Sequence, residues 1–165
     1  MEKDFVCKIN ESSSIPDIFE MVKEAVWKSL RRSRAGLTLG LVDMGNHEHG
    51  FVGGYYVTGS NMIVMNESPL KRIQETEPKL LNAYVFHVLL HEYLHSLGIY
   101  EERDVKDLTY EISREIFGER NVVTAISKDI NKFFPNLIYP DGAPNIDAPV
   151  RFVPDFDRSC TRYIG

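Results

Sequence analysis

The sequence predicts an α+β fold in a single domain of 165 residues. Three observations support this prediction: a segment with helical apolar spacing comes first, three short strand-like segments follow, and two further helical segments come after them. The length is sufficient for one substantial core, and 43% hydrophobic with 26% charged residues are ordinary values for a globular domain. Residues 1–14 are interpreted as an N-terminal extension and residues 120–165 as a C-terminal extended arm.

The first predicted helix covers residues 15–32. Serines at positions 12–14 followed by Pro16 are typical of a helix start. Apolar residues then recur with helical period, at Ile18, Phe19, Val22, Val26 and Leu30. Ala35 and Gly36 end this segment and lead into the predicted strands.

Three strands are predicted in the next thirty residues, at 37–44, 51–59 and 61–66. The glycine-bounded sequence GNHEHG separates the first two, and a turn near Gly59 separates the second from the third. This arrangement indicates a small sheet between the first helix and the helices that follow.

A second helix is predicted from Pro78 to Gly98, and a third from about Glu102 to Phe117. Pro78 suits a first helical turn. Gly98 is typical of the left-handed residue after a helix, and Ile99 could make the apolar contact of a Schellman close. The helix before Gly98 is largely apolar, so we expect it to be buried.

The most informative sequence is His91-Glu92-Tyr93-Leu94-His95, near the end of that apolar helix. Two imidazoles four residues apart lie one turn from each other on the same helix face, where both can bind one metal ion. Glu92 is rotated by about 100° from His91, so it would not be a ligand but could contact a water bound to the metal. HExxH in this setting predicts a zinc site.

At this point the chain resembles the zincin metallopeptidases, and HEYLHSLG carries the resemblance. The resemblance implies a small twisted sheet, mostly antiparallel or mixed, packed on a backing helix and on the HExxH helix. It implies one Zn²⁺ held by His91 and His95, with Glu92 as general base. It also implies a peptide substrate lying antiparallel to the edge strand, for which residues 61–66 are the candidate.

A catalytic zinc usually has three protein ligands and one water, so a third ligand is required. In the metzincin-like pattern HExxHxxGxxE, Glu101 occupies the third position and Gly98 the turning glycine. Two departures weaken this likeness: most metzincins have histidine there, and the chain has no methionine after Met65 for a methionine turn. In the rival gluzincin-like pattern the ligand comes from the next helix, where Glu115 lies twenty residues after His95 and Glu111 one turn earlier. We expect Glu101, with Glu115 and then Glu111 as alternatives.

Other residues near the motif are expected to have supporting or structural roles. His87, one turn before His91, is interpreted as a core or supporting histidine, and the cluster His47-Glu48-His49 as an exposed loop. Sequence alone does not choose an oxyanion donor among the nearby tyrosines, Tyr93, Tyr100 and Tyr110. A tail with Asp155, Asp157 and Cys160 could keep the zinc covered, but a structural arm is the preferred interpretation.

Composition bears on compartment and partners. A net charge of −5 argues against nucleic acid as the main partner, because phosphate binding requires clustered Lys and Arg. We see no secretory signal and no apolar run that could span a membrane. Two cysteines near opposite ends do not indicate a disulfide scaffold, so the cytoplasm is expected.

The expected activity is therefore zinc-dependent hydrolysis of peptide bonds in a peptide or protein substrate. Two alternatives remain: a metal-dependent endoribonuclease, since HxxLHSLGIY is also similar to a bacterial rRNA-maturation family, and a catalytically silent zinc-binding domain. That ribonuclease family usually lacks the glutamate after the first histidine and needs a basic surface. Both Glu92 and the net charge therefore favour the peptidase. Oligomeric state and cleavage specificity are not predicted.

Overall fold

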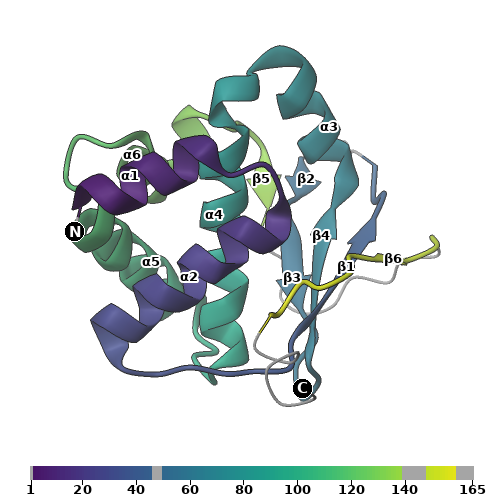
Figure 1. Ribbon diagram of the computed structural model, residues 1–165. Coiled ribbons are helices and arrows are strands. Elements are labelled where there is room, and N and C mark those ends of the chain that lie inside the picture. The colour runs from purple at the N-terminus through teal and green to yellow at the C-terminus, as the bar shows by residue number, and fades with distance from the viewer. Residues whose placement is uncertain (1, 46–49, 139–147, 159–165) are drawn as a thin grey trace.

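The computed structural model describes residues 2–45, 50–138 and 148–158, and they form an α+β fold, as predicted. Figure 1 shows α4 in the centre, with α1, α5 and α6 on one side of it and the strands on the other. The helices are α1 (Glu2–Glu11), α2 (Ile15–Leu30), α3 (Glu67–Thr76), α4 (Leu81–Ser96), α5 (Glu102–Phe117), α6 (Val122–Lys128) and the 3₁₀ segments η1 (Pro78–Leu80) and η2 (Ile130–Lys132). The strands are β1 (Thr38–Val42), β2 (Phe51–Val52), β3 (Gly54–Tyr56), β4 (Met62–Asn66), β5 (Leu137–Ile138) and β6 (Arg151–Phe152).

The main sheet is mixed and has the order β3-β4-β1-β6. β1 pairs in parallel with β4 and antiparallel with β6, while β3 pairs antiparallel with β4. The prediction that residues 61–66 form the sheet edge is therefore wrong, because β4 is hydrogen-bonded on both sides. The edge strands are instead β3, which lies next to α4, and β6.

The predicted strand at 51–59 divides into two short strands of different sheets. β2 pairs with β5, whereas β3 joins the main sheet, and Gly53 lies between them. A side chain at Gly53 would place its Cβ 3.0 Å from the hydroxyl oxygen of Tyr84 and 3.1 Å from Leu137. Glycine therefore lets the chain pass close to α4 without displacing these two side chains.

Local capping signals set the start of α2 and the end of α4, as the sequence predicts. At the start of α2, the Ser14 hydroxyl accepts a hydrogen bond from the amide of Asp17. At the end of α4, Gly98 has φ +96°, its amide donates to the His95 carbonyl, and the Ile99 amide donates to the Leu94 carbonyl. These two hydrogen bonds form the Schellman motif that Gly98 and Ile99 predict.

The two terminal segments contribute more structure than an extension and an arm. Residues 2–11 form α1, which buries Phe5 and Ile9 four residues apart on one helix face. Within the predicted arm, residues 122–128 form α6 because Val123 and Ile126 bury an apolar face. Among the described residues later in the chain, β6 adds a strand to β1.

A strap over the domain, residues 151–158, follows from β6. Phe156 is 3% exposed and its ring stacks on that of Phe19 at 4.0 Å between centroids. The Asp157 carboxylate forms an ion pair with Lys23 at 2.8 Å and accepts a hydrogen bond from the Leu37 amide. The strap therefore holds α2 against the start of the sheet.

α4 lies at the centre of the core. It contacts β3 and β4 on one side and α2, α5 and α6 on the others. Almost every residue between Ala83 and Ser96 is buried, so this helix is apolar all round. None of the helices among the described residues is long and apolar enough to cross a bilayer.

Candidate metal centre

The last two turns of α4 place two imidazoles side by side. His91 is 1% exposed, and the ring centroids of His91 and His95 lie 5.0 Å apart. This is the proximity expected from their spacing of four residues on a helix. Their Nε2 atoms both face Glu102, the first residue of α5.

Glu102 completes a three-residue cluster with these histidines. Its Oε2 lies 2.9 Å from Nε2 of His91, and its Oε1 lies 2.8 Å from Nε2 of His95. The ligand atoms of the three residues lie within 4.8 Å of one another, and among the described residues this is the group of His, Cys, Asp and Glu that could hold a metal ion. Two imidazoles and one carboxylate are also the donor set of the His₂Glu catalytic zinc sites.

The expected third ligand, Glu101, is not part of this cluster. It is the residue before α5, with an extended backbone at φ −71° and ψ 122°, and its side chain is exposed. Glu102 follows as the first helical residue and faces the histidines instead. A change of one position at a helix start redirects the side chain by about 100°, which decides which glutamate meets the imidazoles.

The two alternative ligands lie far along α5. Glu115 accepts a hydrogen bond from the Ser29 hydroxyl on α2 at 3.0 Å. It lies thirteen residues after Glu102 on the same helix, which corresponds to about 20 Å along the axis. Glu111 is exposed nine residues after Glu102. The structure brings neither of them to the histidines.

Hydrogen bonds fix the orientation and protonation of His95. Its Nδ1 donates to the Ile99 carbonyl at 2.8 Å, so Nε2 is the atom that faces the cluster. Burial opposes protonation of His95, but the hydrogen bond with Glu102 and the nearby carboxylates outweigh it and raise the pKa of the imidazole. Burial likewise opposes ionisation of Glu102, but the two histidines outweigh it and lower the pKa of the carboxyl to about 2. Without metal, Glu102 therefore binds the histidines as a carboxylate.

Glu92 is a buried carboxyl next to the cluster. Its side chain is on a different face of α4 from His91, as expected from adjacent helical positions, and the residue is only 3% exposed. Burial raises the pKa of the Glu92 carboxyl, while the charges of His91 and His95 and a hydrogen bond from the Tyr56 amide act in the opposite direction. A raised pKa at a carboxyl in a site is typical of groups that take up and release protons.

An arginine holds the edge strand to the end of α4. Arg34 donates to the Tyr56 hydroxyl at 2.9 Å, to the Ser96 carbonyl at 2.8 Å and to the Ser60 carbonyl at 2.7 Å. Its own amide donates to the Tyr93 hydroxyl. Arg34 thereby fixes β3, and the Tyr56 amide of this strand donates a hydrogen bond to Glu92. The arginine therefore contributes to the position of this carboxyl.

The structure distinguishes the three tyrosines. Tyr93 is fully buried and its hydroxyl accepts from Arg34, so it has a structural role. Tyr110 is half-buried on α5, where Arg114 lies over its ring. Tyr100 is 65% exposed in the loop between His95 and Glu102. Tyr100 is therefore the tyrosine of the three that solvent can reach beside the cluster.

His87 and the tail residues are separate from the cluster. His87 is buried one turn before His91, and burial together with the His91 charge lowers the pKa of its imidazole to about 3. Asp157 binds Lys23 rather than the histidines, and Asp155 is exposed in a turn. His47, Glu48, His49 and Cys160 lie outside the described residues.

Comparison with protein-family models, with curated proteins and with solved structures finds no match for this chain.

Proposed function

We propose that this chain is a zincin-like, zinc-dependent metallopeptidase with His91, His95 and Glu102 as ligands. The observation that supports it is the convergence of these three donors beside Glu92, a buried carboxyl one residue after the first histidine. Three protein ligands would leave one position of a bound zinc open for water. Glu102 takes the role that the sequence assigned to Glu101.

Zinc in this site would supply Lewis acidity, because it lowers the pKa of a bound water and polarises a carbonyl group. Glu92 would accept a proton from such a water and return it to the leaving amine. Its buried environment supports this role, since burial raises the pKa of the Glu92 carboxyl above its ordinary value. The Tyr56 amide keeps the carboxylate oriented through a hydrogen bond.

The position of β3 favours an extended peptide as substrate. β3 pairs with β4 on one side only, and the Tyr56 amide on its other side donates to Glu92. Backbone groups alternate in direction along a strand, so the amide and carbonyl of Gly54 face the same way as those of Tyr56. An added strand would bind there through its own backbone groups, next to the proposed general base.

The test is elemental analysis for zinc together with turnover of an unfolded protein. Glu92→Gln should keep the zinc and lose at least about 100-fold in turnover, because general acid–base catalysis contributes roughly 10²–10⁴-fold. Glu101→Gln is the matched control, since this glutamate is exposed and outside the cluster. It should leave both zinc content and turnover unchanged.

Three results would overturn the proposal: no zinc in the purified protein or on titration, full turnover in Glu92→Gln, or turnover that survives a chelator. Structured RNA tested in parallel separates the peptidase from an endoribonuclease. Zinc binding without hydrolysis of either substrate would indicate the silent zinc-binding domain. The low cysteine content supports the cytoplasm as the proposed compartment.

A further inference from the structure

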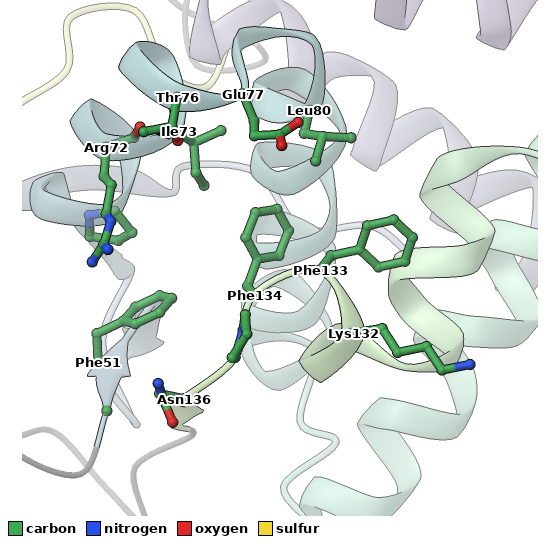
Figure 2. A pocket seen from close by; sticks show the side chains of 13 residues that line it. Phe51, Arg72, Ile73, Thr76, Glu77, Leu80, Lys132, Phe133, Phe134 and Asn136 are labelled. Carbon is green, nitrogen blue, oxygen red and sulfur yellow. Dashed lines mark hydrogen bonds between the residues drawn. The ribbon is translucent and has the colours of Figure 1, made fainter.

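A cavity away from the metal cluster has a volume of about 790 Å³. It lies between α3, the residues around η2 and the start of β2, as Figure 2 shows. Small-molecule sites in proteins are typically cavities of about 300–1,000 Å³ with mostly apolar walls. The size of this cavity is therefore that of a site for one small organic molecule.

Aromatic and aliphatic side chains form one part of the cavity wall, and polar side chains such as Thr76 and Asn136 form the rest. The rings of Phe51 and Phe134 both project into the space, from opposite walls, with Ile73 and Leu80 above them (Figure 2). Phe134 is 7% exposed and its ring packs edge-on against that of Tyr84 at 4.9 Å. Such walls favour an apolar ligand with a flat face, because offset or edge-on aromatic contacts add to the burial of apolar area.

One cation lies at the mouth of the cavity. The guanidinium of Arg72 extends from α3 towards β2 and lies beside Phe51 in Figure 2. No described residue forms an ion pair with Arg72. The other cation of the lining, Lys132, extends away from the space, and Glu77 lies at the opposite end near Leu80. The charge beside the Phe51 ring is thus positive.

This cavity is separate from the metal cluster. Leu80 directly precedes α4, and His91 lies ten residues after Leu81 on that helix, which corresponds to about 15 Å along its axis. No lining residue belongs to the cluster or to β3. A ligand here would not occupy the position of the scissile bond.

We propose that this cavity binds a free small carboxylic acid with an aromatic ring, with the ring between Phe51 and Phe134 and the carboxylate on Arg72. Planar guanidinium groups bind carboxylates through paired hydrogen bonds, which supply orientation as well as affinity. The proposal depends on the charge and walls of the cavity and not on the peptidase activity.

The experiment measures binding of three matched probes by NMR chemical-shift perturbation: 3-phenylpropionate, its neutral amide and the corresponding amine. The acid should bind most tightly and shift the amides around residues 72 and 51. Arg72→Gln should weaken binding of the acid by about tenfold, the size expected for one charge-assisted hydrogen bond, and leave binding of the amide probe unchanged. Phe51→Ala should weaken binding of both the acid and the amide probe.

Lys132→Gln is the control, because its side chain points away from the cavity. It should leave all three affinities unchanged, and thermal unfolding of each variant checks that the fold is retained. No binding of the acid at about 10 mM, equal affinity for the three probes, or an acid affinity that survives Arg72→Gln would overturn the proposal. These outcomes are independent of zinc content and turnover.

Discussion

Replacing Glu102 by glutamine tests which residue is the third metal ligand. The two glutamates at 101 and 102 are adjacent and chemically identical, yet only Glu102 contacts both imidazoles, at 2.9 and 2.8 Å. Replacing a residue that only supports a metal ligand typically lowers metal affinity by about 10–100-fold. Replacing a direct ligand should therefore lower the affinity by at least about 100-fold. This corresponds to about 2.7 kcal/mol of binding free energy.

The assay is competition for zinc with a chromophoric chelator at fixed pH and ionic strength. Glu102→Gln should weaken zinc binding by at least about 100-fold, whereas Glu101→Gln and Glu115→Gln should stay within about twofold. A second readout uses the metal-free protein, in which the hydrogen bond with Glu102 raises the pKa of His95. In Glu102→Gln this pKa should fall, as measured by NMR titration of the imidazole.

An unchanged zinc affinity in Glu102→Gln, or a larger loss in Glu101→Gln, would refute this assignment. The pKa of His95 separates the two explanations for a loss of affinity. If the fold collapsed, the folded-state titration of His95 would disappear, while removal of the ligand alone lowers its pKa and retains the dispersed spectrum.

Three other variants or measurements test separate parts of the structure. Arg34→Gln should retain zinc but reduce turnover about tenfold and the free energy of unfolding by about 2 kcal/mol, because hydrogen bonds from a charged group to β3 and α4 are lost. Turnover equal to that of the unmodified protein would show that the edge strand does not depend on this arginine. Phe156→Ala should lower the free energy of unfolding in urea by about 3–5 kcal/mol, because the buried Phe156 ring stacks on Phe19. Phe152→Ala should lower it little, because Phe152 is exposed. Similar losses of stability in the two variants would contradict the role of the strap. The imidazole of His87 should remain neutral in NMR titration down to the lowest pH at which the protein is folded. In the unfolded chain this histidine binds a proton near pH 6.5, whereas in the folded protein it does so only near pH 3. Above pH 6.5 it therefore has no effect on the free energy of unfolding. Between pH 6.5 and pH 3 it lowers that free energy as the pH falls, by up to about 1.4 kcal/mol per pH unit. A titration midpoint above pH 6 would exclude the buried neutral state.

The HExxH helix was predictable because its signals are local. The apolar spacing of α4 and the glycine at its end act within a few residues, so helix, histidine face and Schellman close all follow from the sequence. The glutamate that joins the two histidines was not predictable in the same way. Its identity depends on the direction in which the chain leaves Gly98 and on the residue at which α5 begins, and a difference of one residue decides whether Glu101 or Glu102 faces the imidazoles.

Long-range pairing explains the error at the sheet edge. The apolar residues of Met62–Asn66 predict a strand but do not reveal that β1 pairs with it in parallel. A signal was present nevertheless, because Ile63, Val64 and Met65 are consecutive apolar residues, and such runs are typical of strands covered on both faces. Phe5 and Ile9 gave a comparable local signal for α1, because apolar residues four positions apart lie on one face of a helix.

The cavity at Arg72 and the clamp by Arg34 had no equivalent sequence signal. Each is assembled from segments that lie far apart along the chain, and their residue types are ordinary at helix ends and on surfaces. Only the tertiary arrangement shows that Arg72 lies beside an aromatic wall and that Arg34 lies against the carbonyl end of α4.

The pairing of β6 with β1 has a consequence for biosynthesis. Gly40 and Phe152 are partners across the sheet although more than a hundred residues separate them in the chain. During translation, β1 and β4 can emerge and associate early, but one side of β1 stays uncovered until the ribosome has released the residues up to Asp157. In that interval the growing polypeptide exposes an unprotected strand, and protection from other nascent chains by a chaperone would matter most then.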